Sequence, residues 1–262
     1  MIIRGFTDLQ AEYHRLSAGD LYIGRIHSAF LRQTFFIDLL QRGIHCLPSP
    51  LSQLLSSSKA AQAMVLRDWM LPLTRVIRRR HDLIDAAGGY AAANVGPVVT
   101  KADRMHCGHG VRRWNDIETL YNTTAYSADA YPMVLQPFVE ELVDVRVIIA
   151  GTYVEAYRRF NPNGFRMNLA AGGTSSPFAL ESAAEDFCRT AMARGRFPYA
   201  HLDLLIRGDG TCHLSEIALD GGTKGARIDR KELDRIKSEV LEQCAAEILS
   251  TDPQSGRRQT SP

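Results

Sequence analysis

The sequence predicts an α+β fold, and two groups of patterns support this prediction. A run of strands with alternating apolar residues is expected over 131–139, 144–150 and 153–160, and an Asp-Gly turn between two apolar runs marks a hairpin over 201–216. Helices are expected over 58–70, 181–194 and 230–249. Runs of neighbouring strands with helices before and after them are typical of the α+β class.

The predicted hairpin places two carboxylates face to face. If Asp209 and Gly210 form a two-residue turn, counting outward along the strands puts Asp203 directly opposite Glu216. Such cross-strand partners have Cβ atoms about 5 Å apart. Two like charges at that separation repel unless a hard cation lies between them, so we expect Asp203 and Glu216 to bind Mg²⁺, with Mn²⁺ as a substitute. The alternative is a solvated edge hairpin with two ordinary acids.

Composition limits the function without choosing it. The chain has 262 residues, 45% of them hydrophobic, and a formal net charge of +2, which gives no argument for nucleic-acid or membrane binding. It has no run of about eighteen apolar residues and no secretory pattern at its start, so we expect a cytoplasmic protein. Its five cysteines include no CxxC pair, which predicts neither a disulfide framework nor a zinc knuckle.

A glycine-bearing loop between two strands is the second candidate site. Lys101 ends the strand expected over 96–101, and Gly108 and Gly110 precede the next strand at 111–114. We interpret this as a flap whose backbone N–H groups close on phosphates while Lys101 neutralises them. A simple hairpin turn is the alternative. His106, Cys107 and His109 crowd the loop, but no further ligand pair is spaced to complete a zinc site.

The order of these features resembles the ATP-grasp ligases, and most of all the RimK type, the ribosomal-protein glutamate ligases and their relatives. The resemblance covers about 58–229. The segments that carry it are Leu71–Thr74, Lys101 with the glycine flap, Gln136–Val139, Asp144–Arg146, Arg166–Asn168, Gly172–Gly173, Asp203 and Glu216. It implies an ATP-grasp fold in which two α+β lobes clasp ATP.

The resemblance also implies roles for individual residues. Lys101 would contact the α- and β-phosphates, Asp144 would lie near the ribose, and Arg166 with Asn168 would face the phosphate end. The adenine would be read by backbone groups of Pro137 and Phe138, and Glu140 or Glu141 could instead hold the ribose hydroxyls. The full nucleotide set would be Lys101, Gly108, Gly110, Gln136, Pro137, Phe138, Val139, Glu141, Asp144, Arg166 and Asn168.

The implied activity is that of an ATP-dependent carboxylate–amine ligase. ATP would phosphorylate a carboxylate, and an amine would attack the acylphosphate, releasing ADP and phosphate. The expected catalytic residues are Arg146, Arg166 and Asn168, with Arg227 as a further cation. For Arg146 the alternative is a salt bridge to Glu155 across a hairpin that turns at Ala150-Gly151. The substrates would be a peptide, an amino acid or a small metabolite. A nucleotide-binding regulator without ligase activity and an ATP-grasp kinase are the alternative functions.

Two departures from the family pattern affect these expectations. The metal strand normally reads Glu-x-Asn, whereas here Ala218 follows Glu216, so water or Asp220 would have to replace a ligand. The pre-ATP-grasp unit is short. We divide the chain into this truncated βαβ-like unit (1–57), an N-terminal lobe with the flap (58–130), a C-terminal lobe with the metal site (131–250) and a disordered tail (251–262).

The short unit suggests an interaction surface. Its strand edge at Leu21–Ile26 and its helix face of Phe30, Phe35, Ile37 and Leu40 would be exposed, which favours a homodimer or a partner protein that completes the site. A peptide or protein acceptor would fit such an arrangement. The alternative is that the unit packs on its own lobe.

Overall fold

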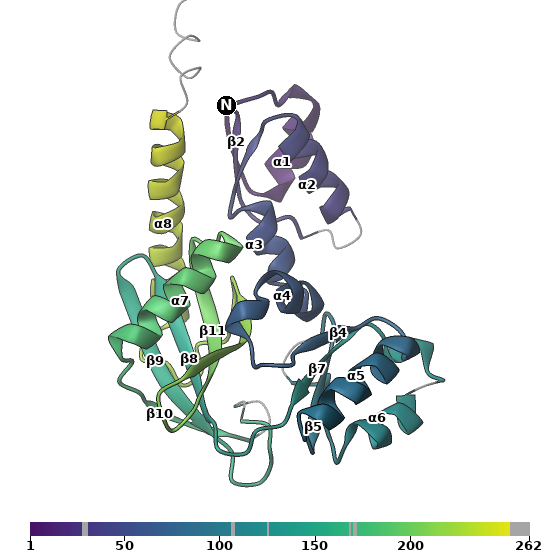
Figure 1. The fold of residues 1–262 in the computed structure, drawn as a ribbon. Helices are drawn as coiled ribbons and strands as arrows, with labels where there is room; N and C mark the ends of the chain where they lie inside the picture. The colour runs from purple at the N-terminus through teal and green to yellow at the C-terminus, as the bar shows by residue number, and fades with distance from the viewer. Residues whose placement is uncertain (28–30, 106–107, 125, 168, 170–171, 252–262) are drawn as a thin grey trace, which may run out of the picture.

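The computed structural model describes all residues except 28–30, 106–107, 125, 168, 170–171 and 252–262. Asn168 and residues 252–262 of the expected tail therefore lie outside the described residues, whereas Thr251 ends the last helix. The described strands form three sheets, one in a small N-terminal unit and one in each of two lobes (Figure 1). The expected α+β class is confirmed. None of the described helices combines the length and apolar character needed to cross a bilayer.

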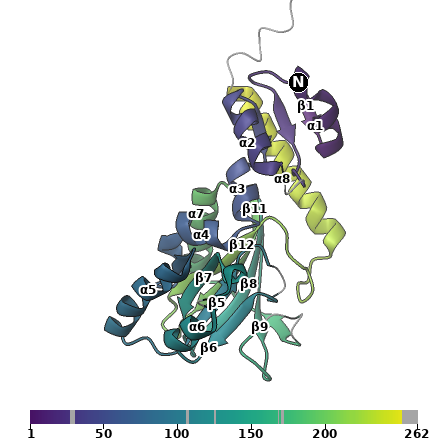
Figure 2. The same ribbon diagram turned by 90° about the vertical axis from the view of Figure 1, so that its right-hand side faces the viewer.

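The N-terminal unit is a three-stranded parallel sheet with helices. Its strands β1 (Ile2–Arg4), β2 (Leu21–Ile23) and β3 (His45–Leu47) lie in the order β1-β2-β3, and its helices are α1 (Phe6–Glu12), η1 (Tyr13–Arg15) and α2 (Arg32–Gln41). The long C-terminal helix α8 (Arg230–Thr251) runs beside this sheet (Figure 2). Ala245 of α8 shares a buried cluster with Leu21, Ile23 and Leu47.

The expectation that this unit exposes a strand edge at Leu21–Ile26 is wrong. Strand β2 is the central strand, and Leu21 and Ile23 are buried because α8 covers them. Phe35 packs edge-on against Phe6 and Tyr13. Ile37 and Leu40 are exposed, at 58% and 56%, whereas Phe30 lies outside the described residues. The unit thus buries most of its apolar surface within the chain.

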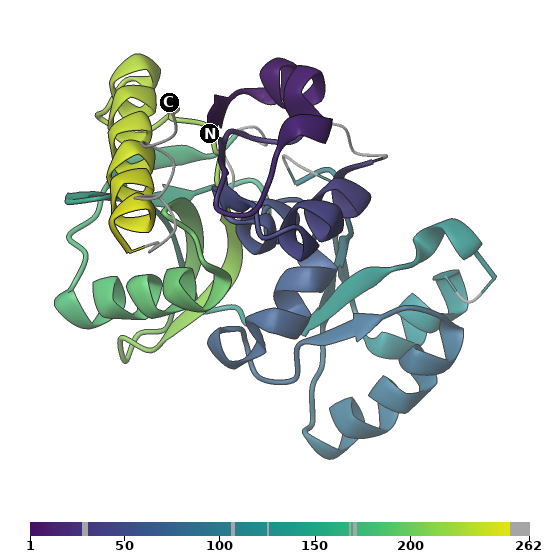
Figure 3. The same ribbon diagram turned by 90° about the horizontal axis from the view of Figure 1, so that it is seen from above.

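The N-terminal lobe has a four-stranded sheet of order β4-β7-β5-β6. Its strands are β4 (Arg75–Ile77), β5 (Val98–Ala102), β6 (Val111–Trp114) and β7 (Met133–Pro137), and its helices are α5 (Arg80–Ala92), α6 (Ile117–Thr124) and η3 (Ala128–Ala130). Strand β7 pairs with β4 and β5, although the predicted boundary at residue 130 places it in the other lobe. Viewed from above, this lobe projects away from the rest of the molecule (Figure 3).

The C-terminal lobe is built on a five-stranded antiparallel sheet of order β10-β9-β8-β11-β12. The strands are β8 (Val143–Ala150), β9 (Tyr153–Phe160), β10 (Thr174–Pro177), β11 (Tyr199–Ile206) and β12 (Cys212–Ala218). Helix α7 (Ser182–Gly195) and the start of α8 pack on it. The largest core cluster lies here, because the central strands β8 and β11 are buried along most of their length.

A helical linker joins the N-terminal unit to the lobes. It comprises α3 (Pro50–Leu55), α4 (Lys59–Val65) and η2 (Arg67–Trp69). Ser58 caps α4 by accepting from the Ala61 N–H, and Asp103 accepts from Ser58 and from the Ala60 N–H. The buried amide of Gln62 donates to the carbonyls of Leu55 and Ile217 and accepts from the Ile217 N–H. This amide therefore fixes α4 to β12, the strand that carries Glu216.

We predict that Gln62→Ala lowers the free energy of unfolding by about 3 kcal/mol, because it leaves the buried polar groups of Leu55 and Ile217 without partners. Denaturant unfolding measures the change. Gln41→Ala, at an exposed helix end, is the control and should cost less than about 0.5 kcal/mol. Equal effects of the two substitutions would contradict the role of Gln62.

Candidate functional site: a nucleotide cavity between two lobes

The hairpin of β11 and β12 brings Asp203 opposite Glu216, as predicted, but by a different register. Ile206 pairs with Cys212, so the turn is longer than two residues, and Gly210 adopts a positive φ of 84° within it. The register then shifts between Leu204 and Asp203, which leaves Ser215 as the extra residue of a bulge. The longer turn and the bulge offset each other, and this restores the Asp203–Glu216 pair.

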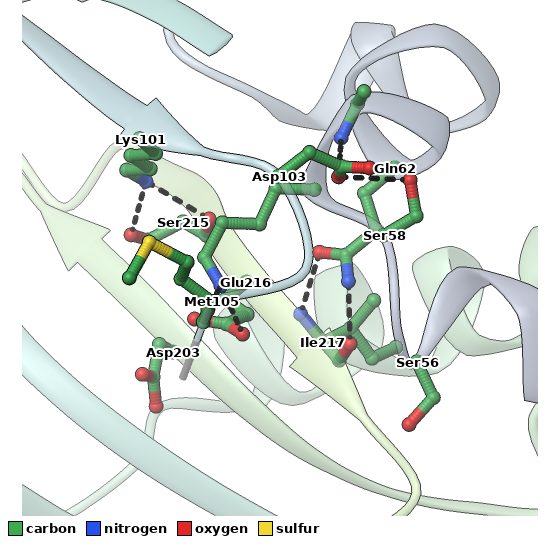
Figure 4. A network of polar contacts seen from close by, with 12 residues as sticks. Ser56, Ser58, Gln62, Lys101, Asp103, Met105, Asp203, Ser215, Glu216 and Ile217 are labelled. Atoms are coloured by element: carbon green, nitrogen blue, oxygen red, sulfur yellow. Dashed lines mark hydrogen bonds and ion pairs between the residues drawn. The ribbon is translucent and has the colours of Figure 1, made fainter. Parts of the chain in front are cut away.

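The bulge connects the two lobes. The buried ammonium of Lys101 donates to the carbonyl of Ser215 at 3.0 Å and to its hydroxyl at 2.9 Å (Figure 4). Lys101 comes from β5 of the N-terminal lobe, so this contact crosses from one lobe to the other. Burial lowers the pKa of Lys101 to about 8, although the nearby Glu216 carboxylate acts in the opposite direction.

A cavity of about 240 Å³ lies between the lobes, and most of the expected nucleotide-binding residues line it. The predicted residues on its wall are Lys101, Gly108, Gln136, Pro137, Phe138, Val139, Asp144, Arg146, Arg166, Asp203 and Glu216. Gly110 and Glu141 do not line it, whereas Glu140 does. Gly110 has a packing role, because a Cβ there would lie 2.9 Å from that of Ala102.

One end of this cavity is apolar. Val99, Leu142 and Leu205 contribute side chains to it, and the buried Gln136 amide is held by Thr74 at 3.0 Å. The backbone N–H of Phe138 donates to the carbonyl of Pro97. The Phe138 N–H thus has a partner within the protein, and the reading of the adenine by backbone groups of Pro137 and Phe138 stays a prediction. The proline at 137 has no N–H to donate.

The opposite end is charged and centres on Asp203. Arg146 donates from Nε to Oδ1 at 2.7 Å and from an Nη to Oδ2 at 2.9 Å, and Arg159 reaches Oδ2 at 3.0 Å. Burial acts to raise the pKa of Asp203, but the two guanidinium groups outweigh it and hold the pKa below its usual value. Arg159 also binds Asp144, whose pKa is raised because the carboxyl is buried.

Glu155, the alternative partner expected for Arg146, does not pair with it, because the register of the hairpin differs from the expected one. The β8–β9 hairpin turns at Gly151 and Thr152, not at Ala150-Gly151, so Glu155 pairs with Ile148. Glu155 instead accepts from the backbone N–H of Arg227 and from its side chain. Arg227 does not line the cavity between the lobes, contrary to its expected role as a cation of the site.

Two cations of the cavity wall were not among the sequence predictions. The Lys59 ammonium donates to Glu216 at 3.0 Å and to the carbonyl of Met105 at 2.6 Å, so it joins the linker, strand β12 and the loop after β5. Arg159 is the second. The correct hairpin register would have revealed it, since it places Arg159 directly opposite Asp144. No local pattern marks Lys59, because its partners are distant in sequence.

Arg166 closes the cavity on the flap side. Its Nε donates to the carbonyl of Val111 at 3.0 Å, which links the loop after β9 to strand β6. The guanidinium also lies 4.8 Å from the ring centroid of Phe165, and Phe165 meets Phe138 edge-on. Arg166 is thus placed at the cavity, as expected.

Carboxylate oxygens suit Mg²⁺, and the two carboxylates retain acceptor capacity. Asp203 accepts three hydrogen bonds or ion-pair contacts and Glu216 accepts one, whereas an ionised carboxylate offers about four lone-pair sites. Within the described residues, no group of three His, Cys, Asp or Glu side chains is arranged to hold a metal. Glu216 and Asp203 therefore fit an ion that keeps most of its ligands as water or nucleotide oxygens.

Two α+β lobes that enclose a cavity lined by both apolar and cationic side chains suit a nucleotide, which has an apolar base and anionic phosphates. The family of RimK-like ATP-grasp domains matches residues 56–240, and the chain belongs to this family. This confirms the resemblance seen in the sequence. No curated protein matches the chain.

Solved structures share the fold at low sequence identity. D-cycloserine synthetase DcsG is similar with a TM-score of 0.61 and 14% identity, over 85% of this chain and 83% of that one. A Chryseobacterium gregarium RiPP-associated ATP-grasp ligase has a TM-score of 0.59 and 15% identity, over 86% and 76% of the two chains. D-alanyl-alanine synthetase A from Vibrio cholerae has a TM-score of 0.57 and 15% identity, over 88% and 77%.

These similarities establish the ATP-grasp fold of the chain. Family and fold agree with the expected class, an ATP-dependent carboxylate–amine ligase.

The buried Lys101 predicts a pH dependence of nucleotide affinity. Its ammonium loses a proton above about pH 8, whereas phosphates are already ionised there because their second pKa is about 6. Affinity for a non-hydrolysable ATP analogue should therefore fall as the pH rises from 8 to 9.5, and binding should take up a proton. Calorimetry in buffers of different ionisation enthalpy measures both.

Lys101→Arg is the control, since arginine stays charged throughout this range. It should remove the pH dependence. A wild-type affinity that does not change between pH 7 and 9.5 would exclude Lys101 from phosphate binding.

Proposed function

We propose that the chain joins a carboxylate to an amine at the cost of ATP, through an acylphosphate, with ADP and phosphate as products. The observation that carries the proposal is the presence of five cationic side chains on the wall of one cavity that also has an apolar part. These are Lys59, Lys101, Arg146, Arg159 and Arg166. Fixed cations in a buried site stabilise the charge that develops during phosphoryl transfer.

The proposed nucleotide orientation follows from the polarity of the cavity. The adenine lies among Val99, Leu142 and Leu205, beside the chain at Gln136–Val139. The phosphates extend toward Lys101 and Lys59. Mg²⁺, held through Glu216 and Asp203, would neutralise phosphate charge when bound. Ala218 offers no side-chain oxygen beside them, so water completes the ligands of the ion.

The proposed reaction has two steps. A carboxylate oxygen of the substrate attacks the γ-phosphorus, the bond from that phosphorus to the β,γ-bridging oxygen breaks, and ADP leaves. The amine nitrogen then attacks the acyl carbon and loses a proton, and phosphate leaves with the carboxylate oxygen. Arg146 and Arg159 line the cavity beside Asp203 and Glu216, where they would stabilise the acylphosphate and the phosphate that leaves it.

An isotope experiment tests this chemistry. The wild-type protein is incubated with ATP, Mg²⁺, hydroxylamine as the amine, and a panel of amino acids and peptides labelled with ¹⁸O in their carboxylates. We expect ADP release to require a carboxylate and one ¹⁸O atom to appear in the phosphate released. A phosphorylated product without free phosphate would identify a kinase. Nucleotide binding without turnover across the panel would identify a regulator, and either result would overturn the proposal.

Glu216→Gln should lower the Mg²⁺-dependent turnover by about 100-fold or more, because it removes a cation-binding carboxylate and the partner of Lys59. Steady-state ADP release over a range of Mg²⁺ concentrations measures this. Glu118→Gln, on the exposed face of α6, makes the same chemical change away from the cavity and should leave the rate unchanged. An unaltered Mg²⁺ response in Glu216→Gln would remove the residue from the metal site.

A further inference from the structure

A second cavity, of about 730 Å³, adjoins the nucleotide cavity. The two share Arg146, Arg159, Asp203 and Glu216 on their walls, so the second cavity opens onto the end where phosphoryl transfer is proposed. From there its wall extends past Ala218 to Asp220 and the glycines at 221 and 222. Asp220 follows Glu216 by four residue steps, which span at most about 13 Å.

The far end of this cavity carries an excess of positive charge. Arg25 and Arg230 both lie beside Asp220 there, and Lys224 also lines the cavity. Asp220 is shared, since it pairs with Arg25, lies 3.9 Å from Arg230, and lies 3.4 Å from the Lys237 ammonium behind it. Lys224 has no ion-pair partner within the part of the chain that the structure describes. Arg230 lies closer to a second carboxylate, Asp234, at 3.0 Å, so two carboxylates face the four cations Arg25, Lys224, Arg230 and Lys237.

Arg25 comes from the N-terminal unit, directly after β2, and is the residue of that unit on the cavity wall. Its side chain is 31% exposed, and burial lowers its pKa because the charged form is partly removed from water. A half-buried guanidinium that shares its acid with two other cations is poised to bind an added anion. The short unit thus contributes a charge to the substrate side.

A buried pair supports the loop that carries Asp220. Lys237 can only donate, so its contact of 3.2 Å makes Nε2 of His201 the acceptor and leaves the proton on Nδ1. Burial lowers the pKa of His201 to about 3, so the ring is neutral. A Cβ at residue 221 would lie 2.6 Å from Nδ1, and glycine there lets the loop approach the ring. Lys237 also holds the Leu219 carbonyl at 2.9 Å.

We propose that the far end of this cavity, formed by Arg25, Lys224 and Arg230, binds a second anionic group of the carboxylate substrate. The inference rests on the proposed function, because the first carboxylate reacts at Arg146 and Arg159. The substrate class is then a molecule with two oxyanions, either two carboxylates or a carboxylate and a phosphate-type group. The N-terminal unit acts as a specificity element through Arg25.

Matched probes test the subsite by calorimetry at constant ionic strength, without turnover. Glutarate has two carboxylates, its monomethyl ester has one, and 3-phosphonopropionate replaces one carboxylate by a phosphonate. We expect either dianion to bind about tenfold more tightly than the ester, as one charge-assisted hydrogen bond would give. Equal affinities for all three probes, or no binding of any, would overturn the proposal.

Two variants test whether the named residues cause the preference for dianions. Lys224→Gln removes a charge that has no partner to lose, and Arg25→Gln removes the charge from the N-terminal unit. Each should reduce the preference for dianions at least threefold. The control is Lys231→Gln, at the exposed neighbour of Arg230 that does not line the cavity, and it should keep the preference. An unchanged preference in both variants would contradict the subsite.

Nucleotide binding, measured in the same preparations, separates this inference from the proposed function. If the ATP analogue binds but dianions are not preferred, the subsite is wrong and the ligase proposal stands. If the ATP analogue does not bind, the proposed function fails.

Discussion

The carboxylate of Asp203, held between Arg146 and Arg159, is the interaction around which the site is arranged. The three residues line both cavities. Their contacts join β8, β9 and β11 across the middle of the C-terminal sheet. Asp144 also pairs with Arg159, so two carboxylates balance the two arginines. The surplus of positive charge on the cavity wall comes from Lys59, Lys101 and Arg166, which outnumber the remaining carboxylates, Glu140 and Glu216. That surplus is what a phosphate or a reacting carboxylate would compensate, and it explains why the cavity suits anions.

Contacts between the lobes depend on the same region. Lys59, Lys101 and Arg166 each bridge parts of the chain that are far apart, and two of them end on β12, at Glu216 and Ser215. The bulge at Ser215 makes this possible, because its carbonyl is free of the ladder and accepts from Lys101. The irregular part of β12 is therefore also its functional part, and Gln62 holds that strand in place from behind.

Much of the fold and of the site could be predicted from the sequence. The helices and strands with strong periodicity were placed within a few residues, and the order of the motifs identified the family. The errors arose where one residue of register decides the outcome. The β8–β9 turn was predicted one residue too early, which paired Arg146 with Glu155. The same error left Arg159 out of the predicted site. The Asp203–Glu216 pair was correct only because a longer turn and a bulge offset each other. The burial of β2 by α8 is a contact over two hundred residues, which no local pattern reveals.

We expect ATP to occupy the cavity between the lobes, with its phosphates beside Lys101 and Lys59. A crystal structure of the protein with a non-hydrolysable ATP analogue and Mg²⁺ would show this. The adenine should lie beside Gln136–Val139, the phosphates within hydrogen-bond reach of Lys101, and the ion on Glu216. A nucleotide bound outside this cavity, or turned with its base toward Arg146 and Arg159, would contradict it.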